Sequence, residues 1–206
     1  MKTERLVLGM LHTNCYIVYD EHSKEAIVVD PADSYPEIKD KILESDLQVK
    51  YIILTHAHCD HIGALDQLVD DTGALVCIGA DDVIALNDGE LNLCNYLGNS
   101  SPTSKADIII NDGDIMKLSD NTIKFITTPG HTKGSISIVV DDAVFSGDTL
   151  FYESIGRTDF ATSDTLAIFD SIKNKLYALG REMTVYPGHG ESTSIGHEID
   201  NNPFVW

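Results

Sequence analysis

Six consecutive residues constrain the fold of this chain most strongly: His56-Ala57-His58-Cys59-Asp60-His61. They place four side chains of the types that bind metal ions directly after the apolar run 51–54, which has the composition of a buried strand. A cluster of surface histidines is the alternative interpretation. The close spacing of the four side chains favours a metal site.

Three more candidate ligands also follow short apolar runs. The runs 123–127, 143–145 and 183–186 precede His131, Asp148 and His189, respectively. In sheets flanked by helices, ligands gather beyond the carboxyl ends of the strands. Four strand ends are therefore expected to bring seven ligands to one edge of the fold.

The ordered set H-x-H-x-D-H, His131, Asp148 and His189 resembles the metallo-β-lactamase superfamily over nearly the whole chain. The resemblance implies an α/β (α+β) fold, a four-layer αββα sandwich formed by residues 1–206 as a single domain. It also implies two metal sites. The first would contain His56, His58 and His131, the second would contain Asp60, His61 and His189, and Asp148 would bridge both.

The chemistry of these side chains agrees with two catalytic metal ions. Imidazole and carboxylate ligands without thiolate suit zinc, iron or manganese, and three protein ligands for each ion leave positions for water. We expect two divalent ions, with zinc first and iron or manganese as alternatives. Two such ions would lower the pKa of a water held between them towards about 7. At neutral pH this water would be present as hydroxide, which is a strong nucleophile. Asp60 is the candidate catalytic residue that orients it.

Composition limits the classes of partner. The chain has 206 residues, is 43% hydrophobic and has a net charge of −19 with only 14 Lys and Arg, so we expect no nucleic-acid substrate. No apolar segment reaches membrane-spanning length, and residues 1–15 lack the apolar core of a secretory signal. The four cysteines show no paired spacing. We therefore expect a cytoplasmic protein with no membrane partner; the sequence leaves its oligomeric state open.

Hydrophobic periodicity predicts two runs of strands, each followed by helices. Strands are expected at about 6–9, 15–19, 26–29, 75–78, 107–110, 115–118, 122–127, 135–140, 143–145 and 183–185, beside the run 51–54. Helices are expected at about 36–45, 62–71, 81–86 and 164–179, with Ser34 as a cap of the first. An irregular loop is expected at 87–105. This pattern fits two packed sheets with helices outside.

Within the superfamily, the segments Gly147-Asp148-Thr149-Leu150-Phe151 and Ser154-Ile155-Gly156-Arg157-Thr158-Asp159-Phe160 resemble the glyoxalase II branch and its short bacterial relatives. The branch implies that Arg157 helps to hold the thiol carrier, so Arg157 is the candidate substrate-binding residue for an anionic group. A loop-fixing ion pair with Asp159 is the alternative role. We expect no C-terminal glutathione-binding helical domain like that of the full-length enzymes, and the chain has Glu191 where they have Tyr.

The resemblance favours a glyoxalase II-like thioester hydrolase whose substrate is a small anionic thioester. The runner-up is a persulfide dioxygenase with mononuclear iron held by His56, His131 and Asp148. A diiron redox module and a lactonase rank lower. The diiron modules typically have Glu where this chain has His58, and we expect no flavin domain.

Overall fold

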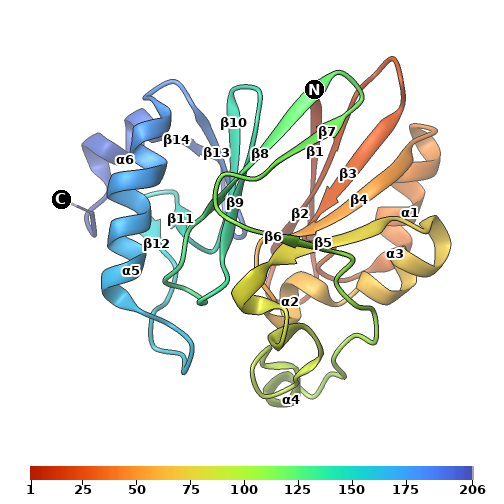
Figure 1. Cartoon of the computed structure of the whole chain (residues 1–206), viewed down its shortest axis with the longest axis horizontal. Coiled ribbons are helices and arrows are strands. Elements are labelled where there is room, and N and C mark those ends of the chain that lie inside the picture. Colours follow the sequence, from red (N-terminus) through yellow and green to blue (C-terminus); the bar gives the residue numbers. More distant parts are fainter. Residues whose placement is uncertain (206) are drawn as a thin grey trace.

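The computed structural model describes residues 1–205 and contains two six-stranded sheets that pack face to face (Figure 1). The first sheet has the order β1 (Lys2–Leu8), β2 (Thr13–Tyr19), β3 (Glu25–Val29), β4 (Gln48–Leu54), β5 (Leu75–Gly79) and β6 (Ile108–Ile110). The second has the order β14 (Thr193–Ser194), β13 (Thr184–Pro187), β10 (Ala143–Gly147), β9 (Ile136–Val140), β8 (Asn121–Thr127) and β7 (Ile115–Leu118). The short strands β11 (Leu150–Phe151) and β12 (Ser154–Ile155) pair antiparallel and form a small hairpin.

Side-chain alternation along the strands divides the apolar residues into separate layers. Ile52 of β4 packs under the helices outside the first sheet, whereas its neighbour Ile53 packs between the sheets. Phe125 and Phe145 of the second sheet meet Ile53 in this central layer. Because both faces of β4 are covered, the strand reads as a continuous apolar run rather than as an alternating one.

The helices cover the two outer faces. Helices α1 (Tyr35–Glu44) and α3 (Leu65–Thr72) pack on the first sheet, and α5 (Thr165–Asp170) lies with α6 (Ile195–Asn201) on the opposite side of the molecule (Figure 1). The short helices α2 (Cys59–Ile62) and α4 (Cys94–Leu97) lie together at one end of the sheets. The predicted four-layer αββα arrangement is confirmed.

Several local expectations were wrong in detail. Ser34 precedes α1 but has a left-handed backbone with φ 50°, and its side chain makes no cap hydrogen bond. The predicted helix 81–86 is a pair of 3-10 turns, Ala80–Asp82 and Ala85–Asn87. The long helix expected at 164–179 begins after Asp164, whose side chain caps it, and continues through a π-helical stretch. Helix α4 interrupts the predicted loop 87–105.

The strand directions decide where the polar loops meet. Strand β4 pairs in parallel with β3 and β5, and β10 pairs in parallel with β13. The loops after β10 and β13 therefore leave the second sheet in the same direction, as does the loop after β8, because β8 and β10 both pair antiparallel with β9. The ligands of the loop after β4 in the first sheet meet them at the same edge of the sandwich. Among residues 1–205, none of the helices combines the length and apolar character that crossing a membrane requires.

Candidate metal centre

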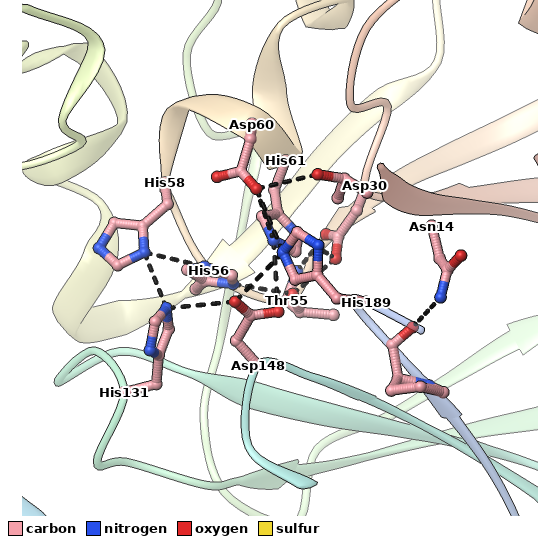
Figure 2. Close-up of polar contacts among 12 residues, drawn as sticks. Asn14, Asp30, Thr55, His56, His58, Asp60, His61, His131, Asp148 and His189 are labelled. Carbon is pink, nitrogen blue, oxygen red and sulfur yellow. Dashed lines mark hydrogen bonds and ion pairs between the residues drawn. The ribbon is translucent and has the colours of Figure 1, made fainter. Parts of the chain in front are cut away.

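The structure brings all seven predicted ligands to one edge of the sandwich (Figure 2). His56, His58, Asp60 and His61 come from the loop after β4 and from α2, and the other three follow β8, β10 and β13. The first group is His56, His58 and His131, and the second group is Asp60, His61 and His189; within each group the ligand atoms lie within 4.8 Å of one another. A further set, His56, His61 and Asp148, meets the same limit and overlaps both groups.

The first group consists of three imidazoles that point at one another. Nδ1 of His58 lies 3.1 Å from Nε2 of His56 and 2.8 Å from Nε2 of His131. All three side chains are buried, with 4% exposure or less. Three ring nitrogens that converge in this way cannot all be satisfied by hydrogen bonds to one another, because each neutral imidazole has only one N–H. A cation would satisfy the three lone pairs at once.

Asp148 lies between this first group and the second. Its Oδ2 is 3.5 Å from Nε2 of His131 and 3.5 Å from Nε2 of His189, and its Oδ1 is 3.4 Å from Nε2 of His61. In the second group, Oδ2 of Asp60 is 3.2 Å from Nε2 of His189. The position of Asp148 is the one that a bridging carboxylate needs.

Hydrogen bonds on the far side of the rings orient two of the histidines. Oδ2 of Asp30 accepts from Nδ1 of His61 at 2.9 Å and from the Thr55 hydroxyl at 2.7 Å. Because the Thr55 hydroxyl donates to Asp30, it can accept from Nδ1 of His56, which lies 3.1 Å away. In its neutral form, each ring then presents the lone pair of Nε2 to the site, which is the form that binds a metal ion.

Backbone carbonyls perform the same task for two other histidines. Nδ1 of His131 lies 2.9 Å from the carbonyl oxygen of Arg157, and Nδ1 of His189 lies 3.2 Å from that of Leu11. Both Nδ1 atoms must donate, since a carbonyl can only accept. His58 differs, because its Nδ1 faces the site and its Nε2 has no partner.

Unpaired buried atoms indicate that the site suits metal ions. Among residues 1–205, the buried side-chain atoms without a hydrogen-bond partner include Nε2 of His61 and Oδ1 of Asp148, which face each other. Leaving polar atoms buried and unpaired is costly. A side chain at Gly188 would overlap Oδ1 of Asp148 and the ring of His61, so glycine keeps this space open. The donor set and the unpaired atoms both fit divalent ions.

Burial and the neighbouring imidazoles keep His56 and His58 neutral. Burial lowers the pKa of His56 well below its usual value, and the nearby imidazole of His61 adds to this effect. Burial, reinforced by His131, lowers the pKa of His58 to about 3. Neutral imidazole is the form that binds a metal ion, so His56 and His58 need lose no proton at neutral pH.

The carboxylates of the site remain ionised although they are buried. Burial opposes ionisation of Asp148, but the imidazoles of His61 and His189 hold its pKa well below the usual range. The same two imidazoles lower the pKa of Asp60 against burial. Conversely, burial would lower the pKa of His189, but Asp148 and Asp60 raise it to about 9. At neutral pH the His189 imidazole of the second group therefore carries a positive charge, which a bound divalent cation would replace.

Asp82 ties together two of the ligand loops. Its buried carboxylate accepts hydrogen bonds from the backbone N–H of Ala57 at 3.0 Å, from the Thr132 hydroxyl at 2.8 Å and from the Gly134 N–H at 2.9 Å. Ala57 separates His56 from His58, and Thr132 follows His131. Asp82 is therefore a positioning residue for the first group of imidazoles.

The loop that carries His189 is held by β2. The side-chain amide of Asn14 donates to the carbonyl oxygens of Pro187 and Gly190, each at 2.9 Å. The Tyr16 hydroxyl donates to the same Pro187 carbonyl at 2.7 Å. The neighbouring Thr13 hydroxyl donates to Oδ2 of Asp60 at 2.9 Å, which orients the predicted catalytic carboxylate.

The sequence interpretation did not include these supporting residues. Asp30 was detectable, because it follows the apolar run 26–29 in the same way that Asp148 follows its strand. Asp82 and Asn14 gave no comparable signal. Each is a single polar residue whose role depends on contacts with distant parts of the chain.

A cavity of about 780 Å³ opens onto the ligands and includes Arg157 in its wall. The Arg157 guanidinium makes two hydrogen bonds to Asp159, at 2.9 and 2.8 Å, and lies over the ring of Phe160. The ion pair with Asp159, the alternative role that the sequence predicts for Arg157, is thus present. Both side chains are 67% exposed, so the pair is screened by water and remains in reach of a ligand. The Phe160 ring in turn packs edge-on against His58 and His131.

The fold and the convergent His and Asp side chains define a metal-dependent hydrolase of the αββα class. The sequence profile of the metallo-beta-lactamase superfamily matches residues 8–189, and this chain belongs to that family. Proteins of this superfamily bind divalent metal ions, and the cluster described above is the corresponding site of this chain.

Three relatives are similar over almost their whole length. The hydroxyacylglutathione hydrolase GloC of Haemophilus influenzae is 31% identical, over 100% of this chain and 98% of its own. The crystal structure of the BLEG-1 B3 metallo-beta-lactamase has a TM-score of 0.95 and 35% identity, and it covers 99% of each chain. TTHA1623, crystallised in a di-iron-bound form, has a TM-score of 0.86 and 32% identity, over 98% of this chain and 100% of its own.

Proposed function

We propose that this protein hydrolyses thioesters of small acids and that the carboxylates of Asp60 and Asp148 serve this reaction. The observation that carries the proposal is the complete set of seven ligands in two groups, with Asp148 between them. Similarity to a hydroxyacylglutathione hydrolase supports a thioester as the substrate. We propose two divalent ions, with zinc first; iron is an alternative, because one relative was crystallised with two iron ions.

Bound metal ions would lower the pKa of a water ligand towards about 7 and polarise the substrate carbonyl. The residues of this chain supply the positioning. Asp60 lines the cavity, and the Thr13 hydroxyl holds its Oδ2 in place. That oxygen can accept a hydrogen bond from the attacking water and so direct the water's lone pair towards the carbonyl.

The far-side acceptors prevent the ligands from turning away from the site. Nδ1 of His61 is held by Asp30, and Nδ1 of His189 by the Leu11 carbonyl. A fixed geometry lowers the barrier because the site need not reorganise as charge develops. We also propose Arg157 as the group that contacts an anionic substituent of the substrate, since it lines the cavity beside Asp159.

The test is thioester cleavage by zinc- or manganese-loaded protein in the complete absence of oxygen, with S-lactoylglutathione and smaller thioesters as substrates. We expect turnover without oxygen, because water is the nucleophile. Oxygen uptake with glutathione persulfide by the iron-loaded protein, together with no thioester cleavage under any metal, would assign the protein to the dioxygenases instead. A β-lactam belongs in the panel as well, because one relative is a B3 metallo-beta-lactamase.

A further inference from the structure

Three large apolar side chains remain exposed at the cavity that contains the metal ligands. Leu11 is 50% exposed, Tyr96 is 75% exposed and Leu97 is 44% exposed, and all three line this cavity. We call these three residues the apolar rim. Scattered apolar residues on a surface need no explanation, but a group at the mouth of a site indicates a binding surface.

The apolar rim is attached to the segments that carry the ligands. The Leu11 carbonyl faces Nδ1 of His189 at 3.2 Å. Tyr96 and Leu97 belong to α4, which lies next to α2 in Figure 1. The backbone N–H of Cys59 in α2 donates to the Asn92 carbonyl at 2.8 Å, just before α4. The rim therefore has a fixed position relative to the metal ligands.

The apolar surface continues from the rim into the cavity. Leu93, Phe151, Ile155 and Phe160 are partly buried and line the same space. Phe160 packs against two of the ligand imidazoles, so this apolar wall reaches the ligands themselves. A substituent attached near a bond that reacts at the metal centre could remain in contact with apolar side chains until it reaches the rim.

The charged groups of the cavity offer little competition to apolar contacts. Apart from the predicted metal ligands, the charged residues in its wall are Glu90, Arg157 and Asp159. Arg157 is already bonded to Asp159, and Glu90 accepts a hydrogen bond from the Asn95 amide at 2.7 Å. Among residues 1–205, no lysine lines this cavity. Beyond the predicted metal ligands, the only cationic side chain that the described residues place in this wall is therefore Arg157, which is paired with Asp159.

We propose that the apolar rim binds a linear hydrocarbon substituent of the substrate, so that the preferred thioesters are those with an alkyl chain rather than those with a methyl group. This inference rests on the proposed function and specifies its substrate class. The chain could belong to the acyl group or to the thiol, since both meet at the scissile bond. Burying a methylene group contributes about fourfold in binding when it is fully removed from water. The partly exposed rim should give about two- to fourfold for each methylene.

The first experiment compares two substrate series with metal-loaded protein. One series lengthens the acyl group from acetyl to octanoyl on a fixed thiol, and the other lengthens the alkyl thiol of an acetyl thioester. We expect kcat/KM to rise by about two- to fourfold for each methylene in one of the two series. The series that responds identifies which end of the substrate meets the rim. Turnover that is independent of chain length in both would overturn the inference while leaving thioester hydrolysis intact.

The second experiment tests the rim residues directly. The double variant Tyr96→Ser and Leu97→Ser should remove most of the dependence of kcat/KM on chain length. The matched control is Ile84→Ser with Leu166→Ser, because these two side chains are 76% and 81% exposed and lie outside the cavity wall. The control should keep the dependence. If the rim variant kept it as well and instead changed the oligomeric state, the rim would be an interface between copies of this chain.

A binding measurement separates this inference from the proposed function. Butanamide, hexanamide and octanamide contain no thioester, so their binding does not require hydrolysis. We expect calorimetric Kd values to fall by about two- to fourfold for each methylene, and this trend should be lost in the rim variant. Failure of every thioester to react, with this trend intact, would reject thioester hydrolysis and retain the alkyl-binding rim. Equal Kd values for the three amides would reject the rim.

Discussion

Asp30 accepts a hydrogen bond from Nδ1 of His61 at 2.9 Å, where both side chains are shielded from water. The same carboxylate also accepts from the backbone N–H and the hydroxyl of Thr55, each at 2.7 Å. Three donors thus converge on the two oxygens of one side chain. This arrangement determines which nitrogen of His61 faces the metal centre. It requires that the side chain at position 30 accepts a hydrogen bond in all three contacts.

Asp30→Asn should therefore weaken the second metal group. An amide in either orientation places its NH₂ against a group that donates in the present structure. We expect metal affinity at the group of Asp60, His61 and His189 to fall by about 10- to 100-fold, measured by competition with a chelator. Asp40→Asn on the exposed face of α1 is the control. Unchanged affinity in Asp30→Asn would show that His61 does not need this acceptor.

Asp148→Asn should affect both groups, unlike Asp30→Asn. The carboxylate lies within 3.5 Å of His61, His131 and His189, so its charge serves both. Without this negative charge, Asp148→Asn should stabilise bound metal ions and the transition state less well. We expect its activity to fall by about 10²- to 10⁴-fold. Metal analysis after dialysis should show fewer than two ions for each chain. A fully active protein that holds a single ion would contradict the two-metal assignment.

Acid should release the loop 87–105 from α3 before the sandwich unfolds. Burial raises the pKa of Asp66, but hydrogen bonds from Ser104 and Thr103 outweigh burial and lower it. A lowered folded-state pKa stabilises the contact above the unfolded value of about 3.9, and this stability is lost as pH falls through the folded pKa. The protection of the loop amides, measured against their intrinsic hydrogen-exchange rates at the same pH, should therefore fall at low pH.

Asp66→Ala should produce the same release at neutral pH, because the loop loses all its hydrogen bonds to this carboxylate. We expect the opening free energy of the loop to fall by about 1–3 kcal/mol. Asp70→Ala, on the exposed face of the same helix, is the matched control. Equal exchange in the two variants at neutral pH would mean that other contacts hold the loop.

The sequence predicted the layers and the ligands for the same physical reason. Strands covered on both faces are continuous apolar runs, and the polar residues that follow them, such as Asp148, stand out against these runs. The contacts of Asp82 could not be predicted in this way, because they join residues that are 25 to 52 positions apart in the chain. Ser34 was assigned as a cap from residue type alone, yet its left-handed backbone turns the side chain away from that role.

Arg157 and Asp159 give the last prediction, because their ion pair competes with a substrate anion for the same guanidinium. Arg157→Ala should raise KM for an anionic thioester more than it lowers kcat, as expected for a group that binds substrate and transition state equally. Asp159→Asn should have the opposite effect. It frees the guanidinium, and KM for the anionic thioester should fall by about two- to fivefold.

An uncharged thioester of similar size is the control substrate, and both variants should leave its KM nearly unchanged. The comparison distinguishes the two roles of Arg157, because a purely loop-fixing pair predicts similar losses from either substitution. Since the Arg157 carbonyl accepts from Nδ1 of His131, loosening this loop would also lower kcat for every substrate. Equal loss of kcat/KM for anionic and neutral thioesters in both variants would thus assign the ion pair to holding His131 in place.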